Sequence, residues 1–156
     1  MNYISFKFCN FKNVEHQKTL NFLLNSYMSD PMGDYPPHDE NQQRQLVEDL
    51  GSYPTAFVLF LLYDGKYAGM TTCFVNYSTF KMKPYLYVHD VFVLKEYRGK
   101  KLGKALMEQL VSISRERGYC KISLEVRDDN PPAQKLYKNI GFKECEPKMH
   151  YWEKRL

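Results

Sequence analysis

The residues best suited to chemistry form a basic, glycine-containing turn between a strand-like and a helix-like segment. Residues 85–94 are mostly apolar, and the sequence RGKKLGKA follows at residues 98–105. The start of a helix presents free backbone N–H groups and partial positive charge, and glycine lets a ligand approach the backbone closely. This turn predicts a cradle for an anionic, phosphate-bearing ligand. By itself it is equally compatible with an ordinary solvated connection.

A second motif, NPPAQKLYKNIGF at residues 130–142, reads as a short helix with both ends marked. A polar cap and prolines open it, and a glycine closes it. Between the two motifs lie a long amphipathic helix and a strand at residues 123–126. A strand–helix–strand unit of this kind needs a crossover connection, so its two strands are expected to be parallel.

Together the two motifs resemble the GNAT superfamily of N-acetyltransferases. R-G-x-x-L-G-x-A is followed in register by N-x-x-A-x-x-L-Y-x-x-x-G-F, and the motifs cover roughly residues 55–145. The sequence YVHDVFV at residues 87–93 is also similar to the diamine (spermidine/spermine) acetyltransferase branch, in which an acidic pair precedes the end of this strand. The resemblance implies the GNAT acyl-CoA N-acyltransferase fold.

The resemblance implies acetyl-CoA as co-substrate, with no metal. The strand end at Val91, Phe92 and Val93 would pair with the pantetheine arm, and the turn would bind the pyrophosphate. Lys101 stands where the family usually has glycine, but it still offers its N–H if its dihedral angles are ordinary. The remaining residues implied for the coenzyme are Arg98, Gly99, Lys100, Lys101, Leu102, Gly103, Lys104, Asn130, Ala133 and Tyr137.

The implied mechanism is direct attack of an amine on the thioester in a ternary complex. The amine must lose a proton, and the departing thiolate must gain one. Tyr137 matches the family's acid, and an ordinary tyrosine pKa of about 10 keeps it protonated at neutral pH. The alternative is that Tyr137 only packs its helix on the sheet.

His89 and Asp90 are the candidates for the base. His89 stands where the diamine branch has glutamate, and an ordinary pKa of about 6.5 suits the task. In a regular strand Asp90 points to the opposite face, alongside Val88 and Phe92, so only one of the two can face the acceptor. A core histidine, a structural carboxylate and a chain of water molecules are the alternatives.

The acceptor is expected to be a small-molecule primary amine. By resemblance the first two helices and their loop would form its site. The candidates for holding it are Tyr27, Asp34, Tyr35, His89 and Glu125, with Asp30 and His38 as further candidates. Histidine in place of glutamate removes a negative charge and weakens the case for a polyamine. A protein lysine or N-terminus, or a catalytically silent module that binds coenzyme A, are the alternatives.

Composition agrees with one domain over residues 1–156. The hydrophobic content of 44% predicts a packed core, and a net charge of +4 is too small to imply nucleic-acid binding. No apolar run is long enough to cross a bilayer, and no signal-peptide pattern opens the chain, so we expect a cytoplasmic protein without a membrane partner. Family members are often dimers, so a homodimer is a further expectation. The four cysteines lack metal-ligand spacing, which favours reduced thiols in or near the core.

The elements that must position these residues follow from periodicity and turn signals. Helices are predicted at residues 14–28, 39–50 and 131–140, besides the long helix after the turn. Strands are predicted at residues 2–9, 55–63, 66–77 and 85–94, with a tight hairpin at Asp64-Gly65. Residues 142–145 and 149–154 are predicted to close the sheet as a final hairpin. The expected fold is α/β (α+β), with a mixed, mostly antiparallel sheet covered by helices on both faces.

Overall fold

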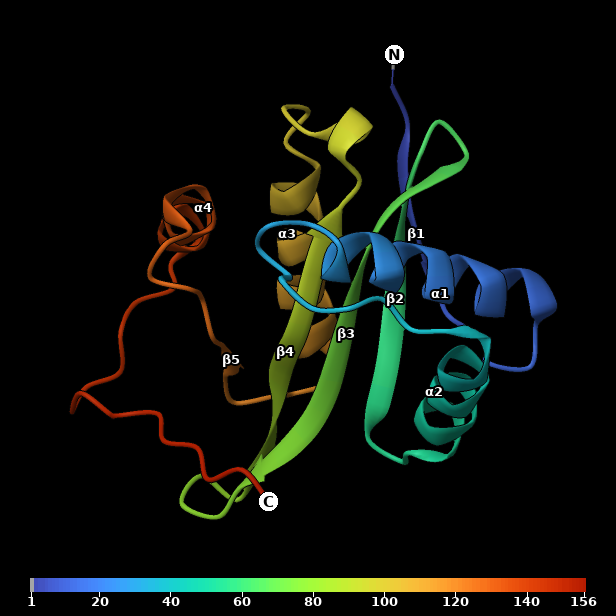
Figure 1. The fold of residues 1–156 in the computed structure, drawn as a ribbon. Coiled ribbons are helices and arrows are strands. Elements are labelled where there is room, and N and C mark those ends of the chain that lie inside the picture. The colour runs from blue at the N-terminus through green and yellow to red at the C-terminus, as the bar shows by residue number, and fades with distance from the viewer. Residues whose placement is uncertain (1) are drawn as a thin grey trace.

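One five-stranded sheet organises residues 2–156, the part of the chain that the computed structural model describes (Figure 1). The strands stand in chain order, the first four are antiparallel, and the last two are parallel. This confirms the predicted mixed sheet. The strands are β1 (Ile4–Phe8), β2 (Ala56–Tyr63), β3 (Lys66–Ser78), β4 (Lys83–Val93) and β5 (Ile122–Leu124).

Helices cover both faces of the sheet. α1 and α2 lie on one face and α3 on the other, and α4 packs beside α3 at the β5 end (Figure 1). No helix within residues 2–156 is both long and apolar enough to cross a membrane. The helices are α1 (Val14–Met28), α2 (Glu40–Ser52), α3 (Leu102–Glu116) and α4 (Pro131–Ile140), with a short 3-10 turn, η1 (Lys95–Tyr97), before α3.

The continuous apolar run of β2 is explained by burial of both its faces. Leu59 and Leu61 pack toward α3, whereas Val58 and Phe60 pack toward α1. A strand that is covered on both sides has no need for alternating polar residues. The sheet is therefore the middle layer of three, with an apolar core on each side.

The β3–β4 ladder contains a bulge at the position that matters most for chemistry. Thr72 pairs with Asp90, but the next residue, Cys73, pairs with Val88. One residue of β4, His89, is therefore extra relative to its partner strand. A bulge of this kind changes the direction in which the following side chains point.

The bulge overturns the prediction that Asp90 faces away from His89. Val88 packs in the core on the α3 face, whereas Phe92 packs on the α1 face, although the two would share a face in a regular strand. The alternation thus reverses between them. As a result His89 and Asp90 both lie on the face covered by α1 and α2.

Beyond the bulge, β4 has an open edge. The β4–β5 ladder ends at Val88 and Leu124, where β5 turns away. The N–H of Leu94 donates to a carbonyl of β3 at 2.9 Å, so the backbone groups of Leu94 face β3. Because strand residues alternate between the two edges, Val91 and Val93 present their N–H and C=O groups to the gap left by β5.

The predicted C-terminal hairpin is wrong. Residues 143–156 contain no strand and follow an irregular path without joining the sheet (Figure 1). Half of these residues are charged, and Pro147 has no N–H to donate to a ladder. The few apolar side chains, such as Met149 and Trp152, are largely exposed instead of buried against β5.

Candidate active site

A cavity of about 690 Å³, which we call the donor cavity, lies along the open edge of β4, between the turn before α3 and the helix α4. It gathers nearly every residue that the sequence assigns to the coenzyme. Lys100 is the exception, because its ammonium lies 5.4 Å from the centroid of the Tyr63 ring and its side chain is exposed. The predicted residues that line the cavity are Val91, Phe92, Val93, Arg98, Gly99, Lys101, Leu102, Gly103, Lys104, Asn130, Ala133 and Tyr137.

The start of α3 differs from the starts of the other helices. Side chains cap α1, α2 and α4, through Asn13, Asp39 and Asn130 respectively, whereas the N-cap of α3, Lys101, makes no side-chain cap hydrogen bond. The first N–H groups of α3 are thus left for a ligand, and the helix dipole favours an anion there. Asn130, in contrast, uses its side-chain oxygen to accept the N–H of Ala133 at 3.3 Å.

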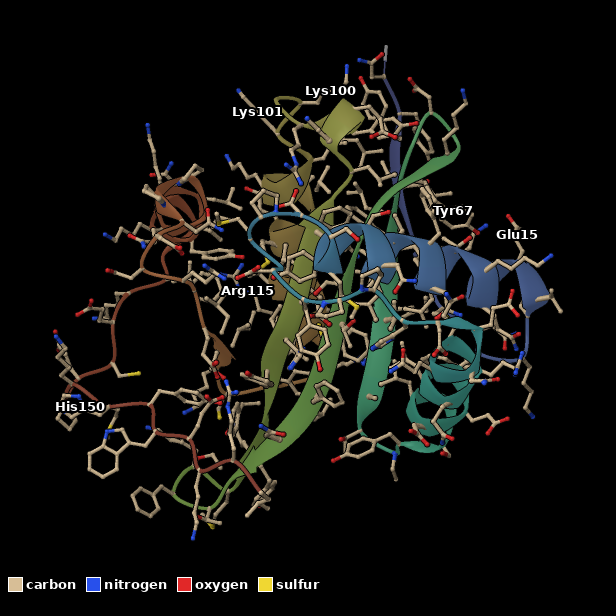
Figure 2. All side chains as sticks on the ribbon, in the orientation of Figure 1. Glu15, Tyr67, Lys100, Lys101, Arg115 and His150 are labelled. Carbon is tan, nitrogen blue, oxygen red and sulfur yellow. The ribbon has the colours of Figure 1, made fainter. Side chains whose placement is uncertain are left out.

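Lys101 adopts dihedral angles that lysine rarely takes. Its φ of 60° and ψ of 20° lie in the left-handed region, so the condition of ordinary dihedral angles is not met. A non-glycine residue in this region costs roughly 1–2 kcal/mol, which is the physical reason why glycine suits the position. Figure 2 shows the side chains of Lys100 and Lys101 projecting outward at the end of the molecule where α3 begins.

Tyr137, on α4, lines the donor cavity and is partly buried there. Burial raises its pKa to about 12, and the neighbouring Tyr27 acts in the same direction. The phenol therefore stays protonated at neutral pH. It meets the chemical requirement for a proton donor, although its ring also packs against Phe142 at a centroid distance of 5.9 Å.

A second cavity, of about 980 Å³, lies on the α1–α2 face, and we call it the acceptor cavity. Both cavities are lined by Tyr27, His89, Glu125 and Arg127. They therefore adjoin at the point where β4 and β5 diverge. A reactant in one cavity can meet a reactant in the other across this junction.

Most of the predicted acceptor residues line the second cavity. Tyr27, Tyr35, His89 and Glu125 do so, and His38 and Asp90 join them. Asp34 is absent from its wall, and Asp30 lines the donor cavity instead. Sequence reasoning missed several further residues of the acceptor cavity, among them Phe74, Tyr87, Cys145, Met149 and Tyr151.

His89 stands in an aromatic and acidic environment. Its Nδ1 lies 3.1 Å from Oδ1 of Asp90, and its ring lies edge-on to Phe74 and Tyr87, with centroids 5.9 and 6.1 Å away. The hydrogen bond to Asp90 raises the pKa of His89. With Nδ1–H donating to the carboxylate, the neutral ring keeps an unprotonated Nε2, which suits a general base.

Glu125 is held at the junction by a bond between the diverging strands. The hydroxyl of Tyr87 donates to its Oε1 at 2.8 Å. Burial and the Glu125 carboxylate both raise the pKa of Tyr87, so the tyrosine remains a neutral donor. This bond holds the Glu125 carboxylate at the wall of the acceptor cavity.

The cysteines and acidic side chains offer no metal centre within residues 2–156. No group of three or more His, Cys, Asp or Glu side chains there is arranged to hold an ion. All four cysteines are free: Cys73 is buried in β3, and Cys145 is exposed in the C-terminal segment. Burial raises the pKa of the Cys73 thiol to about 12, which makes it a poor nucleophile.

Comparison with known proteins places these features in a family. The profile described as the acetyltransferase (GNAT) family matches residues 20–142. The N-alpha-acetyltransferase of Sulfurisphaera tokodaii is 34% identical over 113 residues, which cover 68% of this chain and 67% of that protein. The streptothricin acetyltransferase of Streptomyces lavendulae is 37% identical over 82 residues, which cover 53% of this chain and 41% of that protein. The chain spans less than half the length of several curated relatives it matches.

Solved structures agree on the fold. A probable acetyltransferase superposes with a TM-score of 0.83 at 20% identity, covering 99% of this chain and 98% of the other. An aminoglycoside acetyltransferase from an uncultured soil metagenomic sample, in complex with sisomicin, superposes with a TM-score of 0.78 at 16% identity, covering 99% and 97%. At these identities the likeness establishes a shared fold.

Proposed function

We propose, because this chain belongs to the acetyltransferase (GNAT) family, that it transfers the acetyl group of acetyl-CoA to a primary amine of a small molecule. The observation that carries the proposal is the pair of adjoining cavities. One ends at an uncapped helix start, and the other carries aromatic rings and carboxylates. Residues 1–156 are proposed to act as one domain in this reaction.

The donor cavity fits coenzyme A in two respects. The free N–H groups at the start of α3, where Gly103 lies on the cavity wall, suit the pyrophosphate. The open backbone edge at Val91 and Val93 suits the amides of the pantetheine arm, because an extended ligand can pair there as a strand would. When bound, acetyl-CoA supplies an activated acetyl group as a thioester.

The protein's part in the chemistry is to move two protons and to hold the reactants. Nε2 of His89 accepts a proton from the attacking amine, while Asp90 steadies the imidazole through Nδ1. Attack of the amine nitrogen on the thioester carbonyl forms the C–N bond and an oxyanion, and the C–S bond breaks when that oxyanion collapses. Tyr137 gives its hydroxyl proton to the departing thiolate sulfur, and open-edge N–H groups of β4 stabilise the oxyanion.

A positively charged small molecule is the acceptor class that the cavity supports best. Its wall combines aromatic rings with three carboxylates, of Asp90, Glu125 and Glu144, against the two basic side chains of Arg127 and Lys148. Its volume of about 980 Å³ is within the range of small-molecule sites. Relatives and neighbours include acetyltransferases named for streptothricin and for aminoglycosides. A protein N-terminus is the second candidate, since the relative from Sulfurisphaera tokodaii is named an N-alpha-acetyltransferase.

An acceptor panel tests this proposal. We expect the protein, incubated with acetyl-CoA, to acetylate at least one member of a panel of streptothricin, aminoglycosides and small monoamines, as measured by mass spectrometry. Peptides with free N-termini form the second arm of the panel. Acetylation of peptides alone would favour the second candidate. Binding of coenzyme A without transfer to any amine would identify a silent coenzyme-binding module.

The pH dependence of turnover tests His89 as the base. Because Asp90 raises the pKa of His89, the imidazole stays protonated to a higher pH and kcat/KM falls on the acid side. We expect the midpoint of this acid limb to lie above the ordinary histidine value of about 6.5. Asp90→Asn removes the carboxylate, lowers the pKa of His89 and moves the limb to lower pH.

Asp49→Asn is the matched control for this pH profile. Asp49 lies on α2, accepts a hydrogen bond from Gln45 at 2.8 Å and does not line either cavity. It loses the same charge, so its pH profile should match that of the wild type. An acid limb that stays in place in Asp90→Asn would contradict the assignment of His89 as the base.

A further inference from the structure

Arg98 joins parts of the site that lie on different elements. Its Nε–H donates to the carbonyl of Val93 at 3.1 Å, and its Nη2 lies 2.6 Å from Oδ2 of Asp30. The guanidinium also stands over the ring of Phe92, 5.7 Å from the centroid. Two of these partners belong to β4, and the third belongs to the loop after α1.

The partner loop carries residues of the acceptor cavity. We call residues 29–39, between α1 and α2, the acceptor loop, because Tyr35 and His38 within it line that cavity. Asp30 organises its beginning: Oδ1 accepts the N–H of Met32 at 3.0 Å, and its carbonyl accepts two further N–H groups of the loop. Burial opposes ionisation of Asp30, but the hydrogen bonds from Arg98 and Met32 outweigh it and lower its pKa.

The loop packs closely against the last turn of α1. A Cβ at Gly33 would come within 2.0 Å of the carbonyl oxygen of Tyr27, in the last turn of α1. The ring of Tyr27 in turn lies against Phe92, with centroids 5.4 Å apart. A displacement at Asp30 must therefore reach Tyr27, which lines both cavities.

We propose that Arg98 is a positioning residue that couples the coenzyme site to the acceptor loop, and that it does not act as a phosphate ligand. Its carbonyl partner, Val93, is on the open edge where the coenzyme's arm would pair. A ligand bound at that edge would therefore affect the position of the Arg98 guanidinium. The charge of Arg98 is already matched by Asp30 at a short distance. The inference rests on the proposed binding of coenzyme A at β4.

Hydrogen exchange tests the coupling without any need for turnover. We expect coenzyme A to increase the protection of acceptor-loop amides in the wild type, but not in Arg98→Met or Asp30→Asn. Arg117→Met is the control, since Arg117 stacks on Phe8 and Phe57 at the opposite edge of the sheet. It loses the same charge and a similar aromatic contact, and its loop should be protected as in the wild type.

Kinetics separate coupling from phosphate binding. In Arg98→Met we expect the KM for the amine to rise about tenfold, with little change in coenzyme A affinity measured by calorimetry. Asp30→Asn should have the same effect, and the double variant should be no worse than either single one. Arg98→Lys keeps the charge, but a single ammonium cannot donate to the Val93 carbonyl and the Asp30 carboxylate as the guanidinium does. It should therefore restore the KM for the amine only in part.

The outcomes that overturn the coupling differ from those that overturn the function. A large loss of coenzyme A affinity in Arg98→Met, with loop protection intact, would make Arg98 a phosphate ligand. Equal protection of the loop in all variants would also refute the coupling, and it would leave acetyl transfer standing. A wild-type protein that does not bind coenzyme A would refute the proposed function itself. Melting curves identify any variant that fails to fold. If Arg98→Met is one of them, Asp30→Asn still tests the interaction between Arg98 and Asp30.

Discussion

Replacing Tyr137 with phenylalanine should lower kcat by about 10²-fold or more, with acetyl-CoA affinity almost unchanged. The substitution removes only the hydroxyl, so the packing of the ring against Phe142 is retained. Because burial raises the pKa of Tyr137 to about 12, the wild-type phenol is a stable proton donor across the neutral range. Steady-state kinetics give kcat, and calorimetry with coenzyme A gives the affinity.

Tyr119→Phe is the matched control for this prediction. Tyr119 also packs, partly buried, against the α3 core, but it does not line either cavity. Its kcat should equal that of the wild type. An unchanged kcat in Tyr137→Phe would exclude the hydroxyl as the acid. A fall in coenzyme A affinity as large as the fall in kcat would instead assign Tyr137 to binding.

The parts of the fold that the sequence predicted well are those that local signals determine. α4 begins and ends where predicted, because Asn130 caps it, Pro131 opens it and Gly141 closes it with a positive φ. The Asp64-Gly65 turn connects β2 and β3 as expected, with positive φ at both residues. These features depend on neighbouring residues only, so one sequence is enough to find them.

The features that the sequence could not predict depend on tertiary pairing. The bulge at His89 is a property of the β3–β4 register, and strict alternation therefore placed Asp90 on the wrong face. Strand alternation could have predicted that Tyr87 lines the acceptor cavity, since it lies two residues before His89 on the same face. Phe74 reaches the acceptor cavity from β3, and only the register between the strands brings it beside His89.

Two other differences have a local physical reason. The helix predicted at residues 39–50 continues through Gly51 to Ser52, whose hydroxyl donates to the carbonyl of Glu48 at 2.8 Å. The left-handed conformation of Lys101 is not a preference of lysine and follows from the turn that it occupies. The resemblance indicated this indirectly, because glycine is the usual residue there.

Gly103→Asp should reduce coenzyme A affinity by about 100-fold or more, while the fold remains at least as stable. Gly103 lies in the first turn of α3 on the wall of the donor cavity, where the phosphates are expected to sit. A carboxylate there repels them and competes for the same N–H groups. The same carboxylate interacts favourably with the helix dipole, by about 0.3–1 kcal/mol, so the melting temperature should not fall.

Gly103→Ala separates the effect of charge from that of space. A Cβ at this position would meet only Cδ2 of Leu136 at 3.5 Å, an ordinary van der Waals contact. The alanine variant should therefore bind coenzyme A nearly as well as the wild type, as measured by calorimetry. If alanine were as harmful as aspartate, close approach of the ligand to the backbone would be the requirement. If both variants bound coenzyme A normally, the phosphates would have to lie away from the start of α3.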